Sequence, residues 1–125
     1  MTKQEIHVVL VSNSASRSYP AFLLAVTAAQ TGNKAVMYLT SEALSIVKKG
    51  NVAEQMPGMP TLEQVMGNAL KLGVEIYACG PNIAFLTANG VTMETVKPGI
   101  MLDEAPTFLQ KALAAAKNGG IVTYI

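Results

Sequence analysis

The sequence has only one cysteine and one histidine, and it has no tryptophan. A single cysteine excludes a disulfide within the chain and a thioredoxin-type pair, which needs two neighbouring thiols. It also fits a reducing compartment, where disulfides rarely persist. One cysteine and one histidine cannot supply the four ligands of a typical zinc site. We therefore expect no metal, and we expect no other cofactor.

Charge is also scarce, since 14% of the 125 residues are charged, against about 25% in an average soluble protein. The charged residues are too few for the surface of an ordinary monomer, so we expect part of the surface to be buried in an oligomer. The net charge is +1 and no basic stripe is visible, so nucleic acid is not an expected partner. The first apolar run, which ends at Ser12, is too short for a signal peptide or a membrane span. We predict a cytoplasmic protein without membrane contact.

Strand-like and helix-like segments alternate along the chain. Apolar runs rich in β-branched residues predict strands at 6–11, 35–40, 74–79, 99–102 and 121–125. Helical spacing or capping residues predict helices at 20–30, 41–49, 61–73, 82–88 and 103–117. Thr61 and Gln64 have the spacing of a capping box, and Asp103 is the expected cap of the last helix. This alternation is typical of a parallel sheet with helices on both faces. No linker or repeat interrupts it, so we expect residues 1–125 to form one domain.

Cys79 is the one nucleophile at a predicted strand end. Ligands of open parallel sheets bind beyond the carboxyl ends of the strands, and Cys79 ends the third strand just before a predicted helix. The helix dipole and free N–H groups at that point stabilise a thiolate, so we predict a thiol pKa below the ordinary value of about 8.5. Gly80 would let a substrate approach the backbone closely, and Pro81 and Asn82 complete this candidate substrate site. The same N–H groups suit a sulfonate, phosphate or carboxylate.

Three further residues are candidates for substrate binding. Asn13 and Ser14 follow the first strand and would donate hydrogen bonds to an anion, or they would cap the next segment. Met59 belongs to the proline-containing segment 56–60, which is either a lid over Cys79 or a subunit contact. The apolar helix at 20–30 is the other surface that we expect to be buried between subunits.

The chemistry left to a lone cysteine is limited. A cysteine hydrolase needs a histidine base near the thiol, and His7 lies near the start of the first strand, away from its carboxyl end. A thiolate that accepts a sulfur-containing group and passes it on needs only a reactive sulfur and a pocket that accepts anions. The alternative is a non-catalytic oligomeric subunit or small-ligand-binding module in which Cys79 only packs, because free cysteines are commonly buried.

The segment Val74–Pro81, with the sequence Val-Glu-Ile-Tyr-Ala-Cys-Gly-Pro, resembles the cysteine motif of the DsrE/DsrF-like sulfurtransferase family. This family includes TusD-type sulfur-relay subunits and peroxiredoxin-related proteins. The resemblance covers essentially the whole chain, and its other matching parts are the opening strand, Tyr38–Thr40, Leu70-x-x-Gly73 and Ala105–Phe108. It implies a three-layer α/β/α fold with a five-stranded parallel sheet. It also implies assembly as a dimer, trimer or hexamer, with Cys79 as the sulfur-accepting residue.

In that family the thiol takes sulfane sulfur or thiosulfate and passes it to a small carrier protein with a mobile cysteine. Some members have a second cysteine a few residues further on, but residues 82–89 contain none, which leaves transfer between proteins. The resemblance thus implies a cytoplasmic sulfur-transfer protein whose partners are a sulfur donor and a small cysteine-containing sulfur carrier. A thiol peroxidase is suggested only by the peroxiredoxin-related members, and the chain lacks a resolving cysteine and a Thr-x-x-Cys motif.

Overall fold

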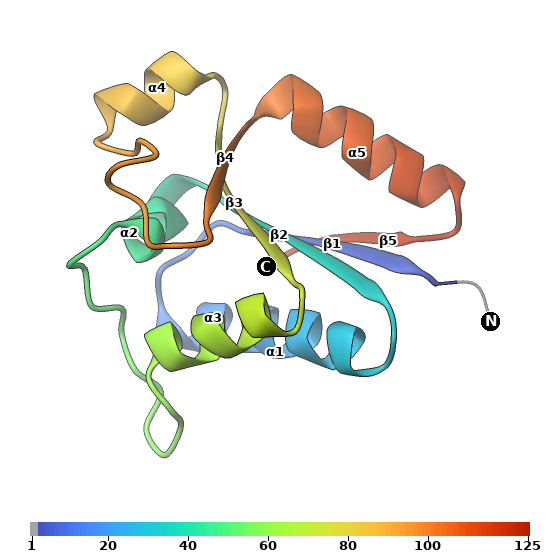
Figure 1. Cartoon of the computed structure of the whole chain (residues 1–125), viewed down its shortest axis with the longest axis horizontal. Helices are drawn as coiled ribbons and strands as arrows, with labels where there is room; N and C mark the ends of the chain where they lie inside the picture. The colour runs from blue at the N-terminus through green and yellow to red at the C-terminus, as the bar shows by residue number, and fades with distance from the viewer. Residues whose placement is uncertain (1–2) are drawn as a thin grey trace.

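Five parallel strands form one sheet in the computed structural model, which describes residues 3–125 (Figure 1). The strands are β1 Glu5–Leu10, β2 Lys34–Leu39, β3 Glu75–Gly80, β4 Met101–Glu104 and β5 Ile121–Tyr124. They lie in the order β4, β3, β2, β1, β5, so the chain moves outward from β1 to β4 and then returns to the opposite edge. The three central strands, β1, β2 and β3, are almost entirely buried, whereas the edge strands β4 and β5 are mostly half-buried or exposed, as expected of a sheet whose centre is covered on both faces.

The helices complete a three-layer arrangement. They are α1 Ala15–Gln30, α2 Leu44–Val47 after a 3-10 turn at Ser41–Ala43, α3 Leu62–Lys71, α4 Ile83–Ala88 and α5 Ala105–Lys117. α1 and α3 pack together on one face of the sheet, and α5 crosses the other face between β4 and β5 (Figure 1). This confirms the predicted three-layer α/β/α fold with a five-stranded parallel sheet. Within residues 3–125, no helix has both the length and the apolar character needed to cross a bilayer.

The two faces of the sheet have separate cores, which we call the α1/α3 face and the α5 face. Alternation along β2 shows the division, because Met37 and Leu39 belong to the large core on the α1/α3 face. Val36 and Tyr38 point the other way, into a smaller cluster with Val9 and Cys79. The cysteine therefore lies under α5, on the less densely covered side of the sheet.

α1 begins five residues earlier than its predicted start at Pro20. The backbone N–H of Ala15 donates to Glu54 Oε1 at 2.6 Å, and this contact with a distant segment stabilises the early start. Pro20 lies inside the helix and cannot donate to the carbonyl of Ser16. Both residues are exposed, so water is able to replace the missing N–H.

The fourth strand and two of the helices also have bounds that differ from the predicted ones. Gly99 has φ 90°, a left-handed conformation that suits glycine, so the chain turns there and β4 begins only at Met101. Asp103, predicted as a helix cap, instead lies in β4 beside Cys79 of β3. The helix predicted over 41–49 ends at Val47. The capping box at the start of α3, formed by Thr61 and Gln64, is present as predicted.

Candidate functional site

A pocket of about 300 Å³ opens at the carboxyl ends of the strands, beneath the first turns of α5. Its walls come from β1, β2, β3, β5 and α5, and the lining residues are Val9, Tyr38, Thr40, Cys79, Gly80, Pro81, Ala105, Phe108 and Tyr124. Val9 and Tyr38 are register partners on adjacent strands, and Phe108 packs edge-on against Tyr38 with ring centroids 4.6 Å apart. The pocket therefore lies at the end of the sheet where α/β proteins bind ligands.

Cys79 lies in the wall of this pocket and is 8% exposed. Among the hydrogen bonds of residues 3–125, none involves its Sγ, so the thiol has no fixed partner there. The pKa of Cys79 is raised to about 11, mainly by burial and further by the charge of Asp103, while the charge of Lys111 opposes both. The predicted low pKa is therefore wrong for the ligand-free chain. Two residues separate Cys79 from the Asn82 cap, and a helix dipole acts only close to its first turn.

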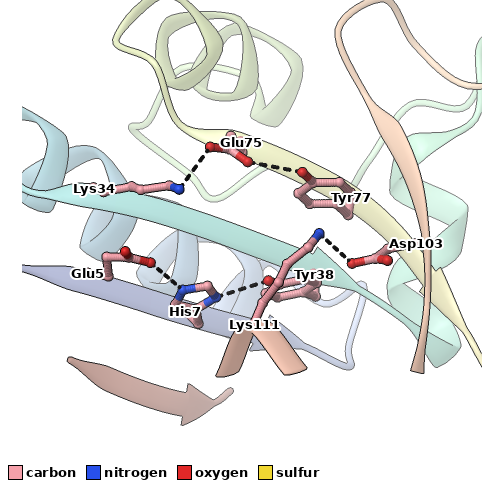
Figure 2. A network of polar contacts seen from close by, with 8 residues as sticks. All are labelled: Glu5, His7, Lys34, Tyr38, Glu75, Tyr77, Asp103 and Lys111. Atoms are coloured by element: carbon pink, nitrogen blue, oxygen red, sulfur yellow. Dashed lines mark hydrogen bonds and ion pairs between the residues drawn. The ribbon is translucent and has the colours of Figure 1, made fainter. Parts of the chain in front are cut away.

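Asp103 and Lys111 form an ion pair (Figure 2), and the strand register places Asp103 next to Cys79. Asp103 is the β4 register partner of Cys79, and its Oδ2 accepts from Lys111 Nζ at 2.9 Å. Lys111 Nζ also lies 3.9 Å from the centroid of the Tyr77 ring. Burial by itself would lower the pKa of Lys111, but the hydrogen bond and charge of Asp103, together with Tyr77, raise it above its ordinary value. Among the described residues, Lys111 is the one cation that acts on the pKa of Cys79, and it is already paired.

A row of hydrogen-bonded side chains, Glu5, His7 and Tyr38, runs along β1 and β2 on the same face (Figure 2), and we call it the polar chain. His7 is 2% exposed, its Nε2 lies 3.0 Å from Glu5 Oε1, and its Nδ1 lies 2.9 Å from the Tyr38 hydroxyl. A carboxylate only accepts, so in the neutral ring Nε2 donates to Glu5 and the Tyr38 hydroxyl donates to Nδ1. Both ring nitrogens are therefore engaged, and His7 is not placed as a base for the cysteine.

The structure brings only part of the predicted site together. Gly80 and Pro81 line the pocket with Cys79, as expected. Asn82 does not line it, because its side chain caps α4 by accepting from the backbone N–H of Phe85 at 2.8 Å.

Asn13 and Ser14 lie elsewhere, in a separate polar pocket formed with Ser45 and residues 50–54. The first N–H of α1, which an anion in that pocket would use, already donates to Glu54. A carboxylate of the chain itself thus occupies the position that we expected an anionic substrate to take.

Met59 is also remote from Cys79. It lies in a groove between α1 and α3 with Leu23, Pro60 and neighbouring side chains, and it packs against the core of the α1/α3 face. The segment 56–60 is therefore not a lid over Cys79, and that interpretation of the sequence was wrong. Its proline-rich sequence indicates an irregular loop but does not say which face the loop covers.

Sequence reasoning missed Asp103, Lys111 and Phe108 as neighbours of the cysteine. Asp103 lies in β4 and Lys111 lies in α5. Whether the two side chains pair therefore depends on how α5 crosses the sheet, which the sequence does not specify. The one sequence signal was Phe108, an aromatic residue near the start of a helix that follows a strand. Fold and site together define a three-layer α/β protein with a buried thiol in an apolar pocket.

Comparison with known proteins is informative mainly about the fold. No protein-family model matches the chain. The Uncharacterized protein MJ0760 of Methanocaldococcus jannaschii is 27% identical over 99 residues, which cover 78% of this chain and 35% of that protein. The chain therefore spans about a third of the length of this curated relative.

Two solved structures share the fold over nearly the full length of both chains. The ychN protein from E. coli superposes with a TM-score of 0.74 at 15% identity, covering 99% of this chain and all of the other. MTH1491 from Methanobacterium thermoautotrophicum, described as a protein of unknown function, superposes with a TM-score of 0.67 at 11% identity, covering 98% of this chain. At these identities the likeness concerns the fold alone, and it agrees with the fold that the DsrE/DsrF-like resemblance implies.

Proposed function

We propose that this protein is a sulfur-transfer protein in which Cys79 accepts a sulfane sulfur atom and passes it to a partner protein. The supporting observation is that the chain's single cysteine lies in the wall of a pocket at the carboxyl ends of the strands. A reducing, cytoplasmic setting and assembly into a homo-oligomer belong to the same proposal. The DsrE/DsrF-like resemblance around Cys79 favours this function over other uses of a lone thiol.

The loading step balances without a cofactor. Cys79–SH reacts with a donor R–S–SH to give Cys79–S–SH and R–SH. A bond forms between Sγ and the outer sulfur of the donor, and the S–S bond of the donor breaks. The bonding pair of that S–S bond and the proton lost by Cys79 both go to the inner sulfur, which leaves as R–SH.

The raised pKa of Cys79, about 11, means that the thiol is protonated at neutral pH. The thiolate is the better nucleophile, so loss of the proton has to accompany attack on the donor. Unloading follows the same chemistry, with the thiol of a carrier protein attacking the outer sulfur of Cys79–S–SH. The carrier has to supply this thiol because the chain has no second cysteine.

Intact-mass measurement after incubation with a persulfide donor tests the proposal. We expect the wild-type chain to gain the mass of one sulfur atom and a Cys79→Ser variant to gain none. Absence of the adduct on the wild type contradicts sulfur transfer. An adduct that persists in Cys79→Ser assigns the reaction to another residue.

The second candidate function is a small-ligand-binding module in which Cys79 only packs. Its supporting observations are the burial of the thiol and its raised pKa. Labelling with iodoacetamide separates the two candidates. A packing cysteine reacts only after unfolding, whereas a sulfur acceptor in an open pocket also reacts in the native chain, at a rate that increases with pH.

A further inference from the structure

We infer that the sulfur donor of Cys79 carries an apolar organic group that binds in the pocket, and that small inorganic polyanions such as thiosulfate are poor donors. This inference rests on the proposed sulfur transfer and narrows its substrate class. It is carried by the composition of the pocket wall and by the arrangement of charge behind it.

The wall of the pocket is apolar and aromatic. None of the described residues that line it has a charged side chain, and three of them, Tyr38, Phe108 and Tyr124, are aromatic. Tyr38 and Phe108 already pack edge to face, a geometry that a further ring is able to extend. A pocket of about 300 Å³ lies at the small end of the usual range for organic ligands. It suits one ring or a short alkyl chain attached to sulfur.

The charged side chains next to the pocket, Asp103 and Lys111, do not favour the binding of a polyanion in it. Asp103 lies beside Cys79 in register, and its negative charge opposes a second negative charge at the sulfur. Lys111 is held by Asp103 at 2.9 Å and by the Tyr77 ring, so its charge is already balanced. A dianion in this pocket would lose its hydration without gaining a free cation, which is strongly unfavourable.

The first turn of α5 does not change this conclusion. A helix N-terminus generally attracts anions through its free N–H groups. Here one of the first positions is Pro106, which has no N–H, and two acidic residues, Asp103 and Glu104, immediately precede the helix. The helix end is therefore a weak anion site compared with an ordinary glycine-rich loop.

The chemistry of transfer points the same way. From an organic persulfide, Cys79–SH and R–S–SH become Cys79–S–SH and R–SH, so no net charge enters or leaves the pocket. From thiosulfate, the thiolate of Cys79 takes the outer sulfur, the S–S bond breaks with its electron pair on the other sulfur, and sulfite leaves. That route brings a dianion in and sends a dianion out through an apolar opening.

Competing donors test the inference on the full chain. The probes are benzyl persulfide generated in situ, glutathione persulfide, whose organic part is polar and charged, and sodium thiosulfate. For each persulfide, the loading rate of the native chain is divided by the rate for the same chain unfolded in urea, which removes differences in intrinsic reactivity. We expect this ratio to be at least about tenfold higher for benzyl persulfide than for glutathione persulfide, and thiosulfate to load the native chain most slowly.

Two variants on α5 test whether the preference for the benzyl donor arises in the pocket. Ala105 is exposed at the mouth of the pocket, so Ala105→Lys adds a cation there with little risk to folding, and it should reduce the preference for the benzyl donor several-fold. Leu113→Ala is the matched control, because Leu113 is on the same helix, 61% exposed and outside the pocket. It should leave the preference unchanged.

Equal ratios for the two persulfides, or fastest loading from thiosulfate, would overturn the inference while leaving sulfur transfer intact. An Ala105→Lys variant with the wild-type preference would overturn it as well. If no donor loads Cys79, the proposed function itself is wrong.

Discussion

The two faces of the sheet are built from the same strands but are organised differently. The α1/α3 face is covered mainly by α1 and α3 and carries a large apolar core that includes Phe22, Leu39 and Ile76, all fully buried. The α5 face is crossed by one helix, in which only Ala112 and Ala115 are buried. This face carries the stacked rings of His7, Tyr38 and Tyr77 together with ion-paired side chains (Figure 2), and it also carries the thiol of Cys79. Stability is therefore concentrated on one face and the candidate chemistry on the other.

The strand order explains this division. The helices that connect β1, β2 and β3 return on one side of the sheet, whereas α5 runs alone from one edge strand to the other. One helix cannot cover five strands, so part of the α5 face is covered by polar side chains that pair with each other. The pocket lies where coverage by α5 begins.

A matched pair of phenylalanine substitutions should show the largest difference between the faces. Phe22→Ala removes a fully buried ring from the α1/α3 core and should lower the free energy of unfolding by about 3–5 kcal/mol. Phe108→Ala removes a partly exposed ring that already borders a pocket, so it should cost less than about half as much. Urea denaturation measures both, and equal losses would contradict the division of stability.

The next largest effect concerns the ion pair beside the thiol. Asp103 raises the pKa of Cys79, so Asp103→Asn should lower that pKa and accelerate alkylation by iodoacetamide several-fold at mildly alkaline pH. Lys111 opposes the rise, so Lys111→Gln should slow alkylation. The measurement is the rate as a function of pH, whose midpoint in the wild type should lie near 11. If Asp103→Asn slowed the reaction instead, Asp103 would be acting as a base for the thiol rather than as a repelling charge.

The smallest effect should come from Glu5, at the exposed end of the polar chain on β1. The hydrogen bond from His7 is the main cause that lowers the pKa of Glu5 below its ordinary value of 4.5. A lowered carboxyl pKa stabilises the fold above the ordinary value, and this contribution disappears as the pH falls through the folded-state pKa. Glu5→Gln should therefore cost less than about 1 kcal/mol at neutral pH, because the pair is partly exposed. The difference in the free energy of unfolding between Glu5→Gln and the wild type should vanish in acid. If that difference persists in acid, it comes from the packing of the side chain rather than from its charge.

Residue patterns were sufficient to predict the fold and one wall of the pocket. The β-branched runs, the capping box at Thr61 and the strand end at Cys79 are local features, and each appears in the structure within a few residues of its expected place. The position of Met59 was not accessible in this way, because a loop sequence does not specify which face the loop covers. The thiol pKa was mispredicted because burial and the Asp103 charge depend on the docking of α5.

The strand order also constrains when the pocket forms. β5 pairs with β1, so Ile6 and Ile121, near opposite ends of the chain, are register partners. Ala105, Phe108 and Tyr124 supply the outer wall of the pocket and all lie in the last segment of the chain. During synthesis, Cys79 therefore leaves the ribosome before the residues that shelter it, and its thiol stays uncovered until the C-terminal strand has docked. Within residues 3–125, the environment of the cysteine is therefore completed after the α1/α3 face.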